Sequence, residues 1–326
     1  MRVAYFDCFA GISGAMALGA LVHAGADLDA IGSALEEFPV GPFALTQELV
    51  EVQGIAAAKI HLRAGPQGVI RTYGSIRSLL AQAELPGESR RTAERMYARL
   101  AQAAGRVHAK EPELVTFHEF GELDCLVEMV GVSLALRQLE VSRVYASPVP
   151  TGMGMIRTEH GLVPVPGPVV LELLRGAPTF SRGIPAELVT AIGAAILASV
   201  AEGYGEMPAM RIDSVGYGAG EIRLDYPNVL RVVIGEEEPA VIAGQQEVLI
   251  EGNVGEASPE AAQMLLQSLL TAGGLTAWAT AVTAPGGEQH AVVSTIVPAW
   301  RADEILAVLR TRSAEGIRVV RIRSRA

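Results

Sequence analysis

The segment Thr116–Gly131, TFHEFGELDCLVEMVG, constrains the fold more than any other part of the chain. Its apolar residues recur at the spacing of an amphipathic helix, in the order Leu123, Leu126, Val127, Val130 and, just beyond the segment, Leu134. Ionisable side chains crowd the same stretch: His118, Glu119, Glu122, Asp124 and Glu128. The sequence therefore predicts a core-facing helix that carries a dense group of carboxylates at its start.

Two interpretations of this group are open. Asp124 and Glu128 are four residues apart on one helix face, where like charges are destabilising unless a cation lies between them. His118 has no capping role there, which favours a metal-binding or catalytic site. The alternative is a solvated helix start, because acidic residues are common in a first helical turn.

The N-terminus predicts a strand followed by a helix. Arg2–Cys8 has the composition of a strand and Ile12–Ala24 that of a helix, with Gly11 and Gly14 in the loop between them. Asp7 then lies at the carboxyl end of the strand, where ligands collect in open α/β sheets. Capping of the loop by Asp7 is the alternative of equal weight.

Further elements follow from periodicity and from Gly and Pro. We predict a hairpin over Gln47–Leu62 that turns at Gly54, and helices from Ser75, over Glu88–Val107, from the central segment to Leu139, from Pro168 to Gly176, and over Ala186–Glu202. His108 closes one of these helices, where a cation suits the helix dipole.

Two Gly-rich segments stand out. The stretch from Ser142 to Pro168 holds five prolines, four glycines and His160, which excludes a helix and predicts strand plus structured loop. MRIDSVGYGAG and NVLRVVIGE read as strands that flank a bend. We interpret Gly152–Gly154 and Gly216–Gly220 as a backbone cradle for a ligand, with ordinary turns as the alternative.

The chain divides after about residue 238. The segment 239–245 reads as a linker, and from Glu247 the pattern is strand, helix, strand, strand, helix, strand to Arg323. This order is that of the ferredoxin-like motif. The sequence thus predicts a mixed-sheet α/β domain over 1–238 and a ferredoxin-like βαββαβ domain over 246–326.

Composition excludes several classes of partner. A formal charge of −10 argues against nucleic acid, and the longest apolar run, Ala191–Ala201, is too short to span a membrane. Two cysteines cannot form a disulfide framework, and Asp7 interrupts any signal-like start. We therefore expect a cytoplasmic protein that binds neither membranes nor nucleic acids, and we expect it to be a homo-oligomer.

Six motifs in fixed order resemble one family. DCFAGISGAM, FHEFGELD, HGLVPVPGP, ELVTAIGAA, GYGAG and PNVLR occur here as in the nickel insertion proteins (LarC-type) of the nickel-pincer nucleotide pathway. The resemblance implies CTP-dependent insertion of nickel into pyridinium-3,5-bisthiocarboxylic acid mononucleotide, with CTP bound together with Mg or Mn. It also implies a sulfur-transferase and a lactate-racemase-like enzyme as pathway partners.

The resemblance and the residue chemistry together suggest roles for individual side chains. Imidazole is a good nickel ligand and carboxylates hold the ion loosely, whereas formation of a nickel–carbon bond requires a base to remove a ring proton. The predicted metal ligands are His108, His118, Glu119 and Asp124. The predicted catalytic residues are Asp7, Glu128 and His160. The predicted cofactor-binding residues are Gly11, Ser13, Gly14, Gly216, Tyr217, Gly218, Asn228 and Arg231, with Arg231 near the phosphate.

The chain also departs from the family pattern. Ala15 replaces an Asp, Ile70 and Thr72 replace histidines, Thr116 replaces a His, and Gly255–Glu256 replaces an Asp pair. These changes leave a non-catalytic metal or nucleotide carrier as one alternative to a working enzyme. A metal-dependent phosphate-ester hydrolase, with Asp7 joining the central carboxylates, is another.

Overall fold

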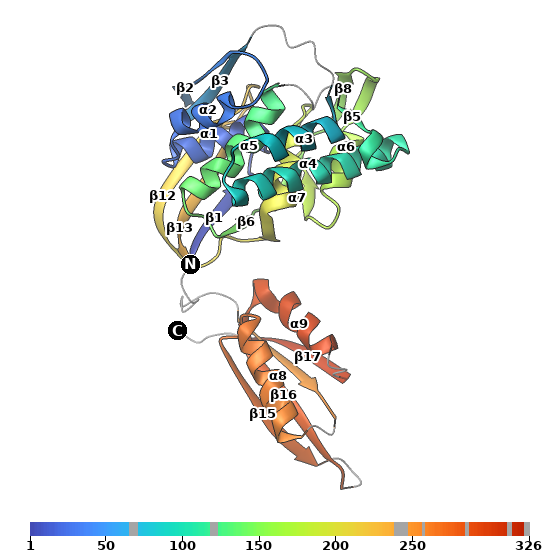
Figure 1. Cartoon of the computed structure of the whole chain (residues 1–326). Coiled ribbons are helices and arrows are strands. Elements are labelled where there is room, and N and C mark those ends of the chain that lie inside the picture. The colour runs from blue at the N-terminus through green and yellow to red at the C-terminus, as the bar shows by residue number, and fades with distance from the viewer. Residues whose placement is uncertain are drawn as a thin grey trace. The chain divides into compact units, whose positions relative to one another are not determined.

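The computed structural model describes residues 1–64, 71–117, 123–237, 247–255, 258–283, 287–311 and 315–322. The chain forms two compact units, Met1–Glu237 and Glu238–Ala326, and each is described by itself (Figure 1). The predicted α/β class is confirmed. The linker expected at 239–245 lies outside the described residues. No helix in the described part of the chain is both long and apolar enough to cross a membrane.

Unit 1 is built on a mixed sheet with the strand order β11-β6-β1-β13-β12-β3-β2. β1 pairs in parallel with β6 and antiparallel with β13. The strands of this sheet are β1 (Arg2–Asp7), β2 (Phe43–Val52), β3 (Ile55–Ala64), β6 (Arg143–Ala146), β11 (Ala201–Tyr204), β12 (Met210–Ala219) and β13 (Val229–Glu237). β2 and β3 form the hairpin predicted around Gly54.

Seven helices of the described residues belong to unit 1, and Figure 1 shows them gathered over one side of the sheet. They are α1 (Gly14–His23), α2 (Leu28–Glu36), α3 (Tyr73–Gln82), α4 (Gly87–His108), α5 (Leu123–Gln138), α6 (Pro168–Leu173) and α7 (Ala191–Val200). Short strands form three two-stranded sheets: β4 (Arg71–Thr72) with β5 (Thr116–Phe117), β7 (Val149–Thr151) with β10 (Thr179–Ser181), and β8 (Gly154–Thr158) with β9 (Gly161–Val165).

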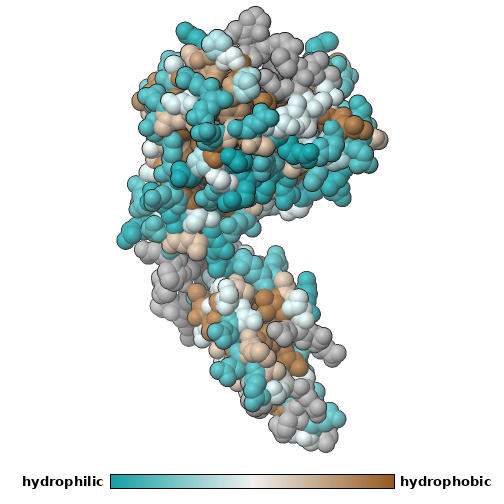
Figure 2. Space-filling view, in the orientation of Figure 1, coloured by the Kyte–Doolittle hydropathy of each residue, from teal (hydrophilic) through white to brown (hydrophobic). Residues whose placement is uncertain are grey.

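The strand period of two decides which side chains meet the helices. Ala4 and Phe6 of β1 belong to the main core together with residues of the helices, whereas Val3 and Tyr5 pack with Val233 in a separate small cluster. On the outer side of α4, Arg91, Arg95, Arg99 and Arg106 are exposed. The side of the unit that carries α3 and α4 is accordingly largely hydrophilic (Figure 2).

The central helix α5 differs from the sequence prediction. We predicted an amphipathic helix, but α5 is buried on nearly all sides because α1, α2, α4 and α7 pack around it. Asp124 is exposed and Glu128 is partly exposed among mostly buried neighbours. Solvent therefore reaches α5 at these two carboxylates, although most of the helix is buried.

Two other local predictions were wrong. The helix expected over Ala186–Glu202 is α7, which starts at Ala191 because Thr190 caps it, and Ala201–Tyr204 forms β11 instead. The helix expected to begin at Ser75 is capped by Thr72, whose hydroxyl accepts the Ser75 N–H. Both ends depend on which hydroxyl the folded backbone brings into place, which periodicity does not report.

Unit 2 has the predicted order strand, helix, strand, strand, helix, strand. Its elements are β14 (Glu247–Asn253), α8 (Pro259–Thr271), β15 (Thr276–Thr283), β16 (Gln289–Pro298), α9 (Ala302–Thr311) and β17 (Glu315–Ile322). The sheet order is β15-β16-β14-β17, and all neighbours are antiparallel. One face of the sheet packs on the helices through Val248, Ile250, Leu265, Leu269 and Ile305. This is the ferredoxin-like arrangement.

Candidate functional site

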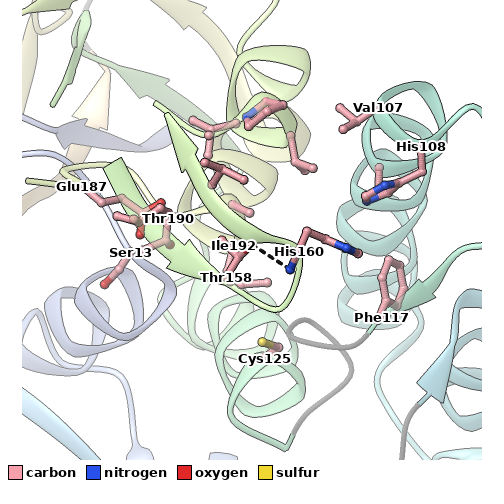
Figure 3. Close-up of a pocket in the computed structure, with 18 of the residues that line it drawn as sticks. Ser13, Val107, His108, Phe117, Cys125, Thr158, His160, Glu187, Thr190 and Ile192 are labelled. Carbon is pink, nitrogen blue, oxygen red and sulfur yellow. Dashed lines mark hydrogen bonds between the residues drawn. The ribbon is translucent and has the colours of Figure 1, made fainter. Parts of the chain in front are cut away.

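A pocket of about 890 Å³ opens in unit 1 and gathers side chains from helices and from the β8–β9 hairpin (Figure 3). Its size suits a nucleotide-sized ligand. We call it the central pocket. Its polar lining residues are Ser13, His108, Thr116, Asp124, Cys125, Glu128, Arg157, Thr158, His160, Glu187 and Thr190.

Two helices begin side by side at one edge of this pocket. The Ile12 N–H donates to the Leu188 carbonyl at 2.9 Å, and the Thr190 N–H donates to the Ile12 carbonyl at 3.1 Å. Ser13 caps α1 and Thr190 caps α7, each with a hydroxyl that accepts a backbone N–H at 3.1 Å. Figure 3 shows these two residues on the side of the pocket opposite His108. The positive ends of both helix dipoles therefore face the pocket.

Glycine is required where the two loops cross. A Cβ at Gly11 would lie 1.9 Å from the Leu188 carbonyl oxygen, and one at Gly193 would lie 2.4 Å from the Ile12 carbonyl oxygen. Gly11 is therefore a packing residue directly behind the pocket, with a φ of 103° that favours glycine.

Glu128 reaches from α5 to the first turn of α1. A Cβ at Gly14 would lie 2.1 Å from Glu128 Oε2, so glycine makes room for the carboxyl group. The Glu128 pKa is raised to about 8, mainly by burial and also by the negative charge of Asp124, and a hydrogen bond from the Ala15 backbone opposes the rise. Glu128 is therefore mostly protonated at neutral pH.

This shift predicts a pH dependence of stability. The Glu128 pKa is raised from its ordinary 4.5 to about 8, so between these values the folded state binds more protons than the unfolded state. Its contribution to the free energy of unfolding is therefore present at low pH and is lost as pH rises from about 5 to 8. Urea titrations at pH 5, 6.5 and 8 should show a smaller fall for Glu128→Gln than for the wild type. Glu221→Gln, at an exposed carboxylate paired with Lys59, is the matched control and should follow the wild type.

Two imidazoles meet on the far side of the pocket. His108 ends α4 and His160 occupies the turn between β8 and β9, and their ring centroids are 4.8 Å apart. The His160 N–H donates to Thr158 Oγ1 at 3.1 Å, which fixes the turn (Figure 3). A role of His108 only as a cation at the helix C-terminus does not require a second imidazole beside it. The contact with His160 therefore favours a role of His108 in a binding site.

The pocket brings together many of the residues singled out in the sequence, but not all. Ser13, His108, Asp124, Glu128 and His160 line it, and Gly11 and Gly14 lie behind it. His118 and Glu119 lie outside the described residues. Among the residues that are described, no three His, Cys, Asp or Glu side chains converge closely enough to hold a metal ion.

Asp7 and Arg231 lie away from the central pocket. Arg231 Nε donates to Asp7 Oδ2 at 3.1 Å, and Arg231 Nη2 forms a second ion-pair contact with the same oxygen. The residues face each other across the β1–β13 ladder, and Phe6, the neighbour of Asp7, points into the helix-covered core. Neither residue lines the pocket, so the position of Asp7 at a strand end was predicted and the direction of its side chain was not.

The Gly216–Gly220 segment has a packing role. A Cβ at Gly216 would lie 1.9 Å from the Ala20 carbonyl oxygen, and one at Gly218 would lie 1.9 Å from the Met16 carbonyl oxygen. Tyr217 between them donates its N–H to His23 Nδ1 at 3.1 Å. Asn228 Nδ2 donates to the Ile222 carbonyl at 2.8 Å and closes the bend. These residues lie outside the central pocket. Gly216 and Gly218 are inside strand β12, where they allow α1 to pack closely on the sheet.

Sequence reasoning missed Arg157, Glu187 and Thr190 as lining residues. Arg157 stands three residues before His160 in the Pro- and Gly-rich segment, and a cation inside a long ordered loop was a usable signal. Thr190 and Glu187 precede a helix whose start was misplaced, so their position could not be inferred.

The fold and the pocket define a two-unit α/β protein with paired imidazoles and carboxylates in a nucleotide-sized cavity. The family model described as nickel insertion protein matches residues 4–326. The chain belongs to this family.

Relatives match along most of the chain. A protein of Geotalea uraniireducens is 39% identical over 278 residues, which cover 84% of this chain and 71% of the relative. Proteins from Nocardioides sp. and Desulfitobacterium hafniense are 38% and 32% identical and cover 98% and 99% of this chain and 81% and 82% of their own. Both are called pyridinium-3,5-bisthiocarboxylic acid mononucleotide nickel insertion protein.

One solved structure is also similar over a short part of the chain. It is described as LarC2, the C-terminal domain of a cyclometallase involved in the synthesis of the NPN cofactor of lactate racemase, in its apo form. It is 17% identical, covers 24% of this chain and 54% of its own, and has a TM-score of 0.23.

Proposed function

We propose that this protein inserts nickel into pyridinium-3,5-bisthiocarboxylic acid mononucleotide. The observation that carries the proposal is the pairing of His108 and His160 inside a pocket that Asp124 and Glu128 also line. The family and the printed names of two relatives support the same reaction.

The pocket supplies nickel ligands of intermediate strength. Imidazole binds nickel well, and the softer thiocarboxylate sulfurs of the substrate compete for the ion once they arrive. Two imidazoles leave coordination positions open for those sulfurs. His118 and Glu119 remain predicted further ligands, and Asp124 is proposed to attract the cation from solvent through its exposed carboxylate.

Glu128 is proposed to accept the ring proton. In this step the ring C–H bond breaks, the nickel–carbon bond forms, and the proton passes to the carboxylate. Arrival of a divalent cation favours the charged form of a nearby carboxyl group, so Glu128 loses its own proton when nickel binds. The Ala15 backbone N–H then holds the carboxylate at the start of α1.

The test is direct. Protein purified from nickel-supplemented cells is analysed for bound metals and then incubated with the thiocarboxylated pyridinium nucleotide and CTP. Stoichiometric nickel and formation of the nickel-pincer nucleotide support the proposal. Nickel without product favours the carrier alternative. The absence of both bound nickel and product would contradict the proposal.

We also propose that the reaction takes place in the cytoplasm, in a homo-oligomer. In the pathway it would follow a sulfur-transferase and precede a lactate-racemase-like enzyme that receives the product.

CTP is expected to bind this chain weakly or not at all. Where the family has paired aspartates for a nucleotide-bound Mg²⁺ or Mn²⁺, this chain offers only Glu256, and the loop 284–291 has no lysine or arginine. Each lost charge-assisted contact is worth ~1.5–3 kcal/mol, so losing two or three moves a micromolar site beyond millimolar. Calorimetric titration of CTP with Mn²⁺ into the whole chain measures this. The arginines near the end of the chain, Arg318, Arg321, Arg323 and Arg325, are the remaining basic residues that could bind a triphosphate, and Arg321 is on β17. Micromolar binding that is abolished by Arg321→Ala would contradict the prediction.

A further inference from the structure

The central pocket contains a cation that the proposed chemistry does not use. Arg157 lies on β8, opposite Leu162 of β9, and it is the one arginine or lysine among the described residues that line the pocket. The proposed nickel ligands and the proposed base are imidazoles and carboxylates. A permanent positive charge near a nickel ion would repel it, so Arg157 needs a different partner.

Arg157 forms no ion pair with any described residue, although Asp124, Glu128 and Glu187 line the same pocket. Some other arginines of unit 1 do have such partners: Arg231 pairs with Asp7, Arg77 with Glu113, and Arg143 with Glu202. Among the described residues, no carboxylate pairs with the guanidinium of Arg157, which can therefore receive an anion that enters from solvent. The charge of the nearby helix N-termini acts in the same direction.

We propose that Arg157 binds the phosphate of the mononucleotide substrate, an inference that rests on the proposed function. A guanidinium presents parallel N–H donors that match two phosphate oxygens. The imidazole pair of His108 and His160 then receives the sulfur-bearing ring, and Arg157 on the same hairpin as His160 receives the opposite end of the molecule. Arg157 thus distinguishes a nucleotide from the corresponding nucleoside. Phosphate binding, which the sequence suggested for Arg231, is assigned to Arg157 instead, because Arg157 lines the pocket and Arg231 does not.

The experiment compares two probes that differ only in the phosphate. Calorimetry on the whole chain measures binding of nicotinic acid mononucleotide and of nicotinic acid riboside, without nickel. We expect the wild type to prefer the mononucleotide by about 10- to 100-fold, the value of one charge-assisted contact. Arg157→Gln should remove this preference and leave the riboside affinity unchanged, and Arg157→Lys should retain part of it. Arg175→Gln, at an exposed arginine outside the pocket, is the control.

Three outcomes would overturn the inference. If Arg231→Gln removes the preference and Arg157→Gln does not, the phosphate binds beside Asp7. If the wild type inserts nickel but binds both probes equally, the inference is wrong while the proposed function stands. If the wild type binds neither probe and inserts no nickel, the proposed function fails and the inference fails with it. Because Arg157 is exposed, its substitution should leave the fold intact. Circular dichroism of each variant checks that it is folded.

Discussion

Replacement of His160 by Ala is expected to lower the rate of nickel insertion by about 100-fold or more. The His160 ring lies 4.8 Å from that of His108, centroid to centroid, so its loss leaves a single imidazole of the pair to hold the ion. Removal of groups that merely orient a metal ligand already costs 10–100-fold, and removal of a ligand costs at least as much. His108→Ala should have the same effect, and the double variant should add little once the pair is broken.

The matched control for this prediction is His61→Ala. His61 is on β3, outside the pocket, where its Nε2 lies 2.9 Å from Glu48 Oε2. Because His108 and His160 are exposed and His61 is partly exposed, all three substitutions should change the free energy of unfolding by less than about 0.5 kcal/mol. Nickel affinity is measured by calorimetry and insertion by product formation. Unchanged nickel affinity in the His108→Ala, His160→Ala double variant would show that the pair is not a nickel site.

Much of the fold was predictable because it depends on local pattern. The strand-like composition of Arg2–Cys8, the turn at Gly54 and the strand–helix order after Glu247 each predict an element without knowledge of the rest of the chain. The surroundings of α5 were not predictable in the same way. Its apolar stripe indicated one buried face, but the packing of four other helices around it is a tertiary property.

The site was predictable as a set of residue types and less so as a geometry. The carboxylates Asp124 and Glu128 were found because acidic residues crowd the start of one helix, and His108 and His160 were found because they match the family pattern. The edge of the pocket at Ser13 and Thr190 depends on the backbone contact between Ile12 and Leu188, a contact between distant segments that no local spacing reports. Asp7 illustrates the converse, because a strand end has two faces and the sequence does not say which one the helices cover.

The Gly-x-Gly pattern of β12 shows why a glycine motif has two readings. Glycines two apart on a strand share one face, and such a face suits either a ligand or a closely packed helix. Here Gly19 of α1 is also tightly placed, because a Cβ on it would lie 2.7 Å from the Ala58 carbonyl oxygen. Small residues on both sides of the contact therefore indicate helix–sheet packing.

Gly218→Val is accordingly expected to destabilise unit 1 strongly. Even the Cβ of alanine would lie 1.9 Å from the Met16 carbonyl oxygen and 2.7 Å from the Ala20 nitrogen, and helix backbone cannot move aside without loss of its own hydrogen bonds. Overpacking of this kind costs about 1–3 kcal/mol for the smaller side chain and more for valine. Gly32→Ala is the opposite control, because nothing lies within 4 Å of a Cβ at Gly32 of α2, and there alanine should stabilise by about 0.5–1 kcal/mol.

The chain offers an internal reference for this measurement. Both of its tryptophans, Trp278 and Trp300, belong to unit 2, so tryptophan fluorescence reports the unfolding of that unit whereas circular dichroism reports both. Gly218→Val should move the circular dichroism transition to lower urea concentration and leave the fluorescence transition in place. A variant that keeps its stability but loses affinity for nicotinic acid mononucleotide would return the glycines to a ligand-binding role.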